Sequence, residues 1–195
     1  DPPLAKRLPS TVKEFMPNAL ERFNVILKDA LELNAQDVPN LANAQHFTLV
    51  ANLPYNVATP IILTLLEKFN NLTSFLVMVQ KEVADRLCAQ PGTKTYGTPS
   101  VKLAWYGESQ KAGLIGRNVF WPAPNVDSAL VYFERNNEIR EDEQEREKVF
   151  KIIDAAFQQR RKTLHSALKG IISNESYDIA GIDPTRRGET LTCAE

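Results

Sequence analysis

Short apolar segments alternate with helix-forming segments along the first two thirds of the chain, and this alternation restricts the possible folds more than any other feature. Three of these segments are rich in β-branched or aromatic residues, as buried strands are: residues 23–27, 47–51 and 74–79. Between the last two, Thr59 and Pro60 form a helix-start signal ahead of apolar residues at helical spacing. Strands that alternate with helices predict an α/β fold with a mostly parallel sheet and helices on both of its faces.

Further local signals extend this pattern in both directions along the chain. Helices are predicted at three more places: from Asp1-Pro2, over residues 81–87 and from Thr98-Pro99. Residues 114–120 and 128–133 are predicted to be strands that pair as a hairpin around the Pro122–Pro124 turn. Residues 1–135 are therefore expected to form one α/β domain.

The sequence changes character after Phe133. Residues 134–148 are strongly charged and predict a linker that leads into a helix. Apolar residues then recur at helical spacing, and three later signals favour more helices: Leu164 to Ile172, the Asp183-Pro184 start and the Thr192-x-x-Glu195 capping box. Residues 139–195 are expected to form a small all-α domain that is cut short at its C-terminal end.

Composition excludes several classes of protein. No apolar stretch approaches the roughly 18 residues of a membrane span, which argues against a membrane partner. The two cysteines, Cys88 and Cys193, are far apart and show no C-x-x-C spacing, so neither a disulfide framework nor a metal site is expected. This cysteine usage favours the reducing cytoplasm. The net charge of −1 does not favour nucleic-acid binding, so a basic surface has to come from a local run of residues.

The residues Asn52-Leu53-Pro54-Tyr55 follow a predicted strand, at the edge where open α/β sheets bind their ligands. An adenine amino nitrogen is a poor nucleophile because its lone pair is delocalised into the ring. The side-chain oxygen of Asn52 and a backbone carbonyl beside Pro54 are suited to accept its two hydrogens, and Tyr55 to stack on an extruded base. The alternative interpretation is an ordinary strand-to-helix turn, in which Asn and Pro are common.

Two further motifs lie downstream. In the segment from Phe120 to Ser128 (FWPAPNVDS), Phe120 is a second candidate for stacking on a base, whereas Trp121 is interpreted as a core residue before a proline-rich turn. In the segment FQQRRKTL, the run Arg160-Arg161-Lys162 is a candidate phosphate-binding surface, although such runs are usually solvated faces.

Together these motifs resemble those of the S-adenosylmethionine-dependent ribosomal RNA adenine dimethyltransferases of the KsgA type. Residues 52–60 (NLPYNVATP) match the family's catalytic motif throughout, and the other two segments match later motifs in the correct order. The resemblance implies a Rossmann-like class I methyltransferase sheet followed by a helical RNA-binding domain. It also implies the activity: transfer of methyl groups from S-adenosyl-L-methionine to N6 of two adjacent adenines in the 3′-terminal hairpin of 16S ribosomal RNA.

The resemblance also assigns roles to single residues. The target amino group is held by Asn52 and a following backbone carbonyl of the Leu53-Pro54 segment, while Tyr55 and Phe120 lie against the base. Asp29 and Ala30, together with Asn52, are expected on the cofactor side, and the basic run 160–162 on RNA. The implied partner is small-subunit ribosomal RNA within the 30S precursor, bound by a cytoplasmic monomer.

The sequence departs from the family in one respect. The first of its eight glycines is Gly92, so the glycine-rich cofactor loop of the family has no counterpart here and is expected to lie before Asp1. Two alternatives remain open. The sister family dimethylates an adenine of 23S ribosomal RNA and confers macrolide resistance, and a non-catalytic RNA-binding assembly factor could use the same scaffold.

Overall fold

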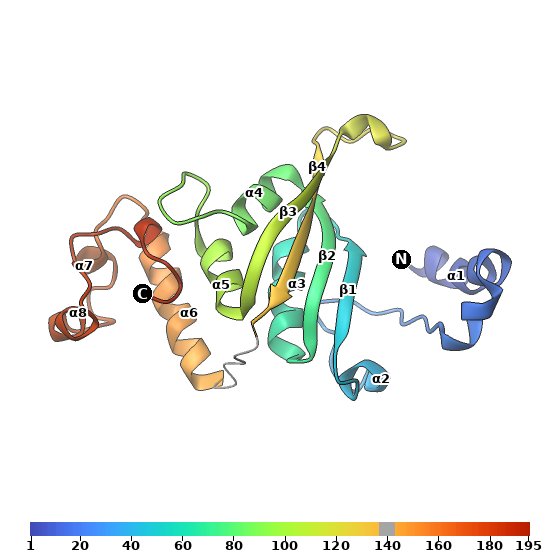
Figure 1. Cartoon of the computed structure of the whole chain (residues 1–195), viewed down its shortest axis with the longest axis horizontal. Helices are drawn as coiled ribbons and strands as arrows, with labels where there is room; N and C mark the ends of the chain where they lie inside the picture. The colour runs from blue at the N-terminus through green and yellow to red at the C-terminus, as the bar shows by residue number, and fades with distance from the viewer. Residues whose placement is uncertain (137–142) are drawn as a thin grey trace. The chain divides into compact units, whose positions relative to one another are not determined.

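The computed structural model of the chain describes residues 1–136 and 143–195 (Figure 1). It divides into two units, residues 1–44 and 45–195, and each is described by itself. The linker predicted at residues 134–148 lies partly outside the described residues, at 137–142. No helix in the described part is long and apolar enough to cross a membrane.

The first unit is helical. Helix α1 (Pro2–Phe15) begins as predicted, because the Asp1 carboxylate accepts a hydrogen bond from the Leu4 backbone N–H at 3.2 Å. A 3₁₀ helix, η1 (Pro17–Arg22), and a short helix, α2 (Pro39–Ala42), follow. The strand predicted at residues 23–27 is wrong: this segment forms no strand, and Val25, Ile26 and Leu27 are exposed. A β-branched segment gains its stability from cross-strand neighbours, and the described part of this unit provides none.

The second unit contains a four-stranded sheet in the order β1-β2-β4-β3. Its strands are β1 (Phe47–Asn52), β2 (Leu72–Gln80), β3 (Gly107–Ile115) and β4 (Ser128–Arg135). The β1–β2 pair is parallel, whereas β2–β4 and β3–β4 are antiparallel. The α/β class is therefore confirmed, but the described sheet is mixed and not mostly parallel as predicted.

Three helices of this unit pack against the sheet: α3 (Ala58–Lys68), α4 (Lys81–Leu87) and α5 (Thr98–Tyr106). Figure 1 shows them on one side of the strands. The fully buried side chains alternate along β2 and β4, with Phe75 stacked on Phe133 at 4.7 Å between ring centroids. The other face carries exposed residues such as Val50, so the described residues of this unit cover one sheet face and not both.

The predicted hairpin is present with shifted boundaries. Strand β3 begins at Gly107, seven residues before the predicted start at Leu114, and it ends at Ile115. Residues 107–113 (GESQKAG) are polar and have little intrinsic preference for a strand. They nevertheless form part of the edge strand because they pair with β4. The residues after β3 form a loop with a 3₁₀ turn, η2 (Arg117–Val119), and not the predicted continuation of the strand.

The C-terminal part is helical, as predicted: α6 (Glu143–Gln158), α7 (Leu164–Ala167), α8 (Asn174–Ala180) and a 3₁₀ turn, η3 (Gly188–Thr190). Its core consists of Ala156, Leu164, Leu168 and Tyr177. Helix α6 contacts α5, where Lys102 pairs with Asp154 at 2.7 Å. The domain boundary between residues 135 and 139 stays a prediction.

Two predicted helix starts near the C-terminus have different outcomes. Asp183 starts no helix, because its carboxylate accepts hydrogen bonds from the backbone and side chain of Thr185 and forms a turn instead. The capping box is formed: Thr192 N–H donates to the Glu195 carboxylate at 3.0 Å, and Glu195 N–H donates to Thr192 Oγ1 at 3.2 Å.

Candidate functional site

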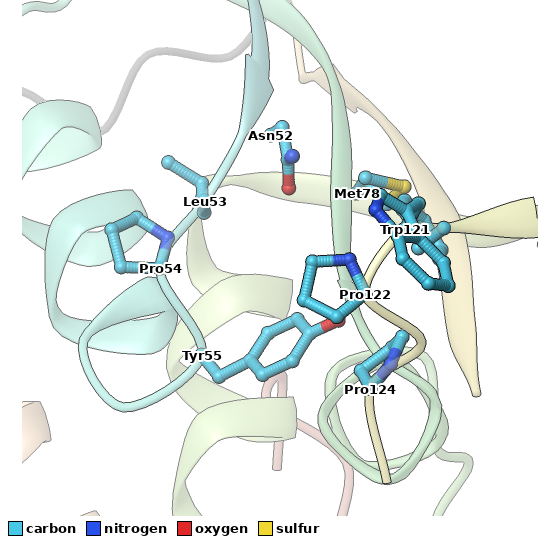
Figure 2. Close-up of a pocket in the computed structure, with 9 residues that line it drawn as sticks. Asn52, Leu53, Pro54, Tyr55, Met78, Trp121, Pro122 and Pro124 are labelled. Carbon is cyan, nitrogen blue, oxygen red and sulfur yellow. The ribbon is translucent and has the colours of Figure 1, made fainter. Parts of the chain in front are cut away.

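The candidate site lies at the C-terminal end of β1. Asn52 is the last residue of this strand and pairs in register with Met78 of β2. The Leu53 N–H then donates to the Met78 carbonyl at 3.1 Å, and its side chain is buried, so the backbone of the motif is fixed to the sheet. Among the described residues the Asn52 side chain has no hydrogen-bond partner, and Figure 2 shows its oxygen directed into a hollow.

Pro54 and Tyr55 form the turn from β1 into α3. The Pro54 carbonyl accepts a hydrogen bond from Val57 N–H at 3.3 Å, and α3 begins at Ala58 with Val57 as N-cap rather than the predicted Thr59. The Tyr55 hydroxyl is 3.2 Å from Oγ of Ser128, the fully buried first residue of β4. This hydrogen bond attaches the Tyr55 side chain to β4, which is separated from β1 by β2 in the sheet.

The opposite wall comes from the loop between β3 and β4. Phe120 is half-buried there, in agreement with a place beside the site. The interpretation of Trp121 as a core residue is wrong: its side chain is 97% exposed, and the Trp121–Pro122 peptide bond is cis. Pro122 and Pro124 follow the indole in this loop, and sequence alone does not reveal which way the indole faces.

The base of this loop is closed by Arg117 and Asp127. The Arg117 backbone N–H and Nε both donate to Asp127 Oδ1, at 3.1 and 3.0 Å, and its Nη1 donates to the Asn125 carbonyl at 2.6 Å. The Arg117 guanidinium holds the pKa of the Asp127 carboxyl below its usual value. The Asp127 carbonyl in turn accepts from Lys81 N–H at 2.9 Å, which attaches the loop to α4.

Together these walls enclose an open hollow of about 420 Å³. It is lined by Asn52, Leu53, Pro54, Tyr55, Met78, Phe120, Trp121, Pro122 and Pro124 (Figure 2). None of these side chains is charged, while one amide and three aromatic rings are among them. The hollow therefore fits a flat nucleobase with an amino group, and it has no counter-ion for a phosphate or an amino-acid end.

Comparison with known proteins places this site in a family. The ribosomal RNA adenine dimethylase family matches residues 1–194. The chain belongs to the ribosomal RNA adenine dimethylase family. It is 65% identical to a protein named ribosomal RNA small subunit methyltransferase A from Bifidobacterium longum (strain NCC 2705), covering all of this chain and 67% of that protein. It is 53% identical to the protein of the same name from Paenarthrobacter aurescens, covering 98% of this chain and 64% of that protein.

Solved structures agree on the fold of the dimethylase. A dimethyladenosine transferase from Plasmodium falciparum is similar with a TM-score of 0.75 at 19% identity, covering 97% of this chain and 75% of that one. The 23S ribosomal RNA methyltransferase ErmE is similar with a TM-score of 0.69 at 20% identity, covering 99% of this chain and 75% of that one. At these identities the likeness shows the Rossmann-like fold alone.

Two of the three predicted cofactor residues of the dimethylase, Asp29 and Ala30, lie in the first unit, whereas Asn52 lies in the second. Asp29 is exposed, and its Oδ1 accepts a hydrogen bond from the Leu31 backbone N–H at 2.9 Å, so part of its carboxylate serves a local turn. Ala30 is half-buried beside it. Their place on the cofactor stays a prediction. Among the described residues, no group of three or more His, Cys, Asp or Glu side chains is arranged to hold a metal ion.

The basic run of the dimethylase follows directly after α6, in a turn and not on the helix. Its three members differ. Arg160 donates to the Lys94 carbonyl and pairs with Glu189, both at 3.0 Å, so it serves the fold. Arg161 and Lys162 are exposed, and neither side chain has an ion-pair partner among the described residues.

Sequence reasoning missed three contributors to the site. Met78 lines the hollow from β2, Ser128 anchors Tyr55, and Arg117 closes the aromatic loop. Ser128 and Asp127 belong to the FWPAPNVDS motif, but the motif by itself does not show which partners they reach. Met78 lies two residues before the end of β2 and beside Asn52 only because of the register of the two strands, which sequence alone does not give.

Proposed function

We propose that this protein transfers methyl groups from S-adenosyl-L-methionine to N6 of two adjacent adenines near the 3′ end of small-subunit ribosomal RNA. The observation that carries the proposal is the unpartnered amide of Asn52, directed into an uncharged, aromatic hollow at the end of β1. Because Asn52 is exposed and has no hydrogen-bond partner among the described residues, its amide is available to a ligand that enters the hollow.

The Asn52 oxygen supplies one acceptor for the adenine amino group. The second acceptor is a backbone carbonyl of Leu53 or Pro54. The Pro54 carbonyl already accepts from Val57 N–H at a long 3.3 Å, and a carbonyl oxygen has a second lone pair available. Two acceptors on the two amino hydrogens localise the nitrogen lone pair and direct it away from the ring. Their alignment before the reaction lowers the entropic part of the barrier.

Tyr55 and Phe120 hold the base by stacking. The Tyr55 ring is fixed through its hydroxyl to Ser128, and Phe120 comes from a loop that is closed by Arg117 and Asp127. An adenine that enters the hollow has left its stack in the RNA, and stacking on aromatic rings replaces part of that energy, roughly 1–3 kcal/mol per base.

The cofactor supplies an electrophilic methyl group when bound. Asp29 and Ala30, with Asn52, are the residues that we assign to its side of the site. The hollow itself contains no charged side chain, so it fits the acceptor base and not the carboxylate and ammonium of the donor's amino-acid end.

Small-subunit RNA is the preferred substrate because the relatives at 65% and 53% identity both carry the small-subunit name. Arg161 and Lys162 are proposed to contact its phosphates. We place the reaction on the 30S precursor in the cytoplasm and expect a monomer to perform it.

The proposal is tested with unmodified RNA. The protein is incubated with S-adenosyl-L-methionine carrying an isotopically labelled methyl group and either 30S precursor particles that contain unmodified small-subunit RNA or large-subunit ribosomal RNA, and the nucleosides are quantified by mass spectrometry. Labelled N6,N6-dimethyladenosine from two adjacent positions of the small-subunit RNA is the expected result. Label in the large-subunit RNA alone would assign the protein to dimethylation of 23S ribosomal RNA instead. Label in neither RNA would refute the proposal that the protein is a methyltransferase.

A further inference from the structure

Trp121 is the most exposed large hydrophobic side chain of the described residues. It is 97% exposed, compared with 81% for Ile179 and 74% for Phe15 and Val50. A tryptophan buries the largest apolar area of any residue when it is covered, so leaving one in water forgoes substantial stabilisation. Its indole N–H also has no hydrogen-bond partner within the described part of the chain. Neither the packing nor the hydrogen bonding of the fold explains this side chain.

The indole is nevertheless held in a defined place. The loop that carries it is closed at its base by four hydrogen bonds from Arg117 to Asp127 and Asn125. The same loop is attached to α4 through Lys81. Phe120, before the indole, is half-buried at the same hollow. An exposed ring on a loop fixed at its base loses little conformational freedom when a partner covers it.

The position of the indole indicates what that partner is. Trp121 lines the hollow that Asn52 and Tyr55 also line, and Figure 2 shows it across the hollow from Leu53 and Pro54. It makes no ring contact with Tyr55 among the aromatic pairs of the described residues. The proposed function assigns Tyr55 and Phe120 to the two faces of one base, which leaves the indole as a third ring at the hollow.

We infer that Trp121 stacks on the nucleobase that neighbours the target adenine in the RNA strand. This inference rests on the proposed function, in which one adenine leaves its stack and enters the hollow. The neighbouring base then has no stacking partner on the side of the extruded adenine. An exposed indole at the hollow replaces it, and the uncharged lining of the hollow favours a base over a phosphate as the contacted group.

The experiment is a thermodynamic cycle on RNA binding. Short single-stranded RNAs carry the target adenine with either an intact nucleotide or an abasic nucleotide at the flanking position, on the 5′ side or on the 3′ side. Their Kd values are measured for the native protein, for Trp121→Ala and for Trp121→Phe. The matched control is Val119→Ala, which changes an exposed apolar residue of the same loop that does not line the hollow.

For the native protein, an abasic nucleotide at one of the two flanks is expected to weaken binding about 5- to 150-fold, equivalent to roughly 1–3 kcal/mol at 1.36 kcal/mol per tenfold change. Trp121→Ala is expected to weaken binding of the intact RNA by a similar factor and to be insensitive to that abasic site. Trp121→Phe should recover most of the affinity, and Val119→Ala should bind as the native protein does. The slope of log Kd against log salt should be the same in all four proteins, because stacking releases no counterions.

Equal reductions of affinity by the abasic site in the native protein and in Trp121→Ala would overturn the inference. The exposed indole would then be assigned to contact with a protein partner. Because binding is measured without methyl transfer, the outcome is independent of the proposed reaction. A protein that binds with the expected cycle but transfers no methyl group would refute the proposed function and retain the base contact.

Discussion

The Arg117 guanidinium lies 3.0 Å from the Asp127 carboxylate and closes the loop that carries Phe120 and Trp121 to the hollow. Both partners are about half exposed, so their ion pair contributes little to the stability of the fold. Its effect is on position: the pair fixes where the aromatic rings stand relative to Asn52.

The first prediction concerns this pair. Asp127→Asn is expected to lower kcat/KM by up to about 10²-fold, the cost of a small misplacement of groups that hold the substrate, with almost no change in Tm. The lowered pKa keeps Asp127 ionised until the pH falls through that pKa, so the effect should be the same throughout pH 5–8. Asp154→Asn, which breaks an ion pair between α5 and α6, is the control and should leave kcat/KM unchanged. Equal reductions of activity in both variants would contradict a positioning role.

The second prediction separates the ring of Tyr55 from its hydroxyl. Tyr55→Leu is expected to remove roughly 1–3 kcal/mol of base stacking and to reduce activity more than Tyr55→Phe. Tyr55→Phe keeps the ring but leaves the buried Ser128 hydroxyl without this partner, which costs roughly 1–3 kcal/mol of the free energy of unfolding.

The matched variant for this pair is Ser128→Ala. Combined with Tyr55→Phe, it removes both hydroxyl groups and should recover part of the stability that Tyr55→Phe loses, as measured by urea denaturation. If Tyr55→Phe reduced activity as much as Tyr55→Leu, the hydroxyl and not stacking would be the functional group.

The third prediction divides the basic run. Replacing both Arg161 and Lys162 with Ala should flatten the log–log dependence of RNA affinity on salt by roughly 0.7–0.9 units for each phosphate that is no longer neutralised. Arg160→Ala should instead lower Tm, because this side chain pairs with Glu189 and the Lys94 carbonyl. An unchanged dependence of RNA affinity on salt in the double variant would show that Arg161 and Lys162 contact no phosphate and are only solvated surface residues.

The fourth prediction concerns the edge of the sheet. A Cβ at Gly107 would overlap the Glu134 carbonyl oxygen and lie 2.8 Å from Arg135 Cα, so the strands would have to separate. Gly107→Ala is therefore expected to destabilise the fold by roughly 1–3 kcal/mol or more. Gly116→Ala has open space around its new methyl group and should be close to neutral. Similar denaturation midpoints for the two variants would show that β3 does not pair with β4 at this point.

The sequence predicted best those elements whose signals are local. Strands β1 and β2 and the helices α4 and α5 have boundaries close to the predicted ones, because apolar segments and helix-start residues carry that information. The Asn52–Tyr55 motif was likewise placed at the end of a strand, since a strand followed by a proline can hardly continue.

The errors arose where tertiary context decides. Residues 23–27 have the composition of a strand but no partner strand in the described part of their unit, whereas the polar residues 107–113 became a strand because β4 pairs with them. Tryptophan is usually covered, which favours a core position for Trp121, and only the course of the loop shows that it is exposed. Arg160 differs from Arg161 because Glu189, far away in sequence, reaches only the former.

The most direct test of the whole account is methyl transfer by Asn52→Ala. Asn52 is exposed and unpartnered among the described residues, so its replacement should leave Tm unchanged while removing an acceptor that acts on the amino group in the reacting complex. By analogy with the loss of an oxyanion-hole donor, kcat should fall about 10²–10³-fold, equivalent to roughly 2.7–4 kcal/mol. The measurement is the rate of N6-methyladenosine and N6,N6-dimethyladenosine formation on small-subunit ribosomal RNA, compared with the native protein. A reduction of this size at unchanged Tm and unchanged RNA affinity is the result that we expect, and a variant that keeps more than about a tenth of the native rate would contradict it.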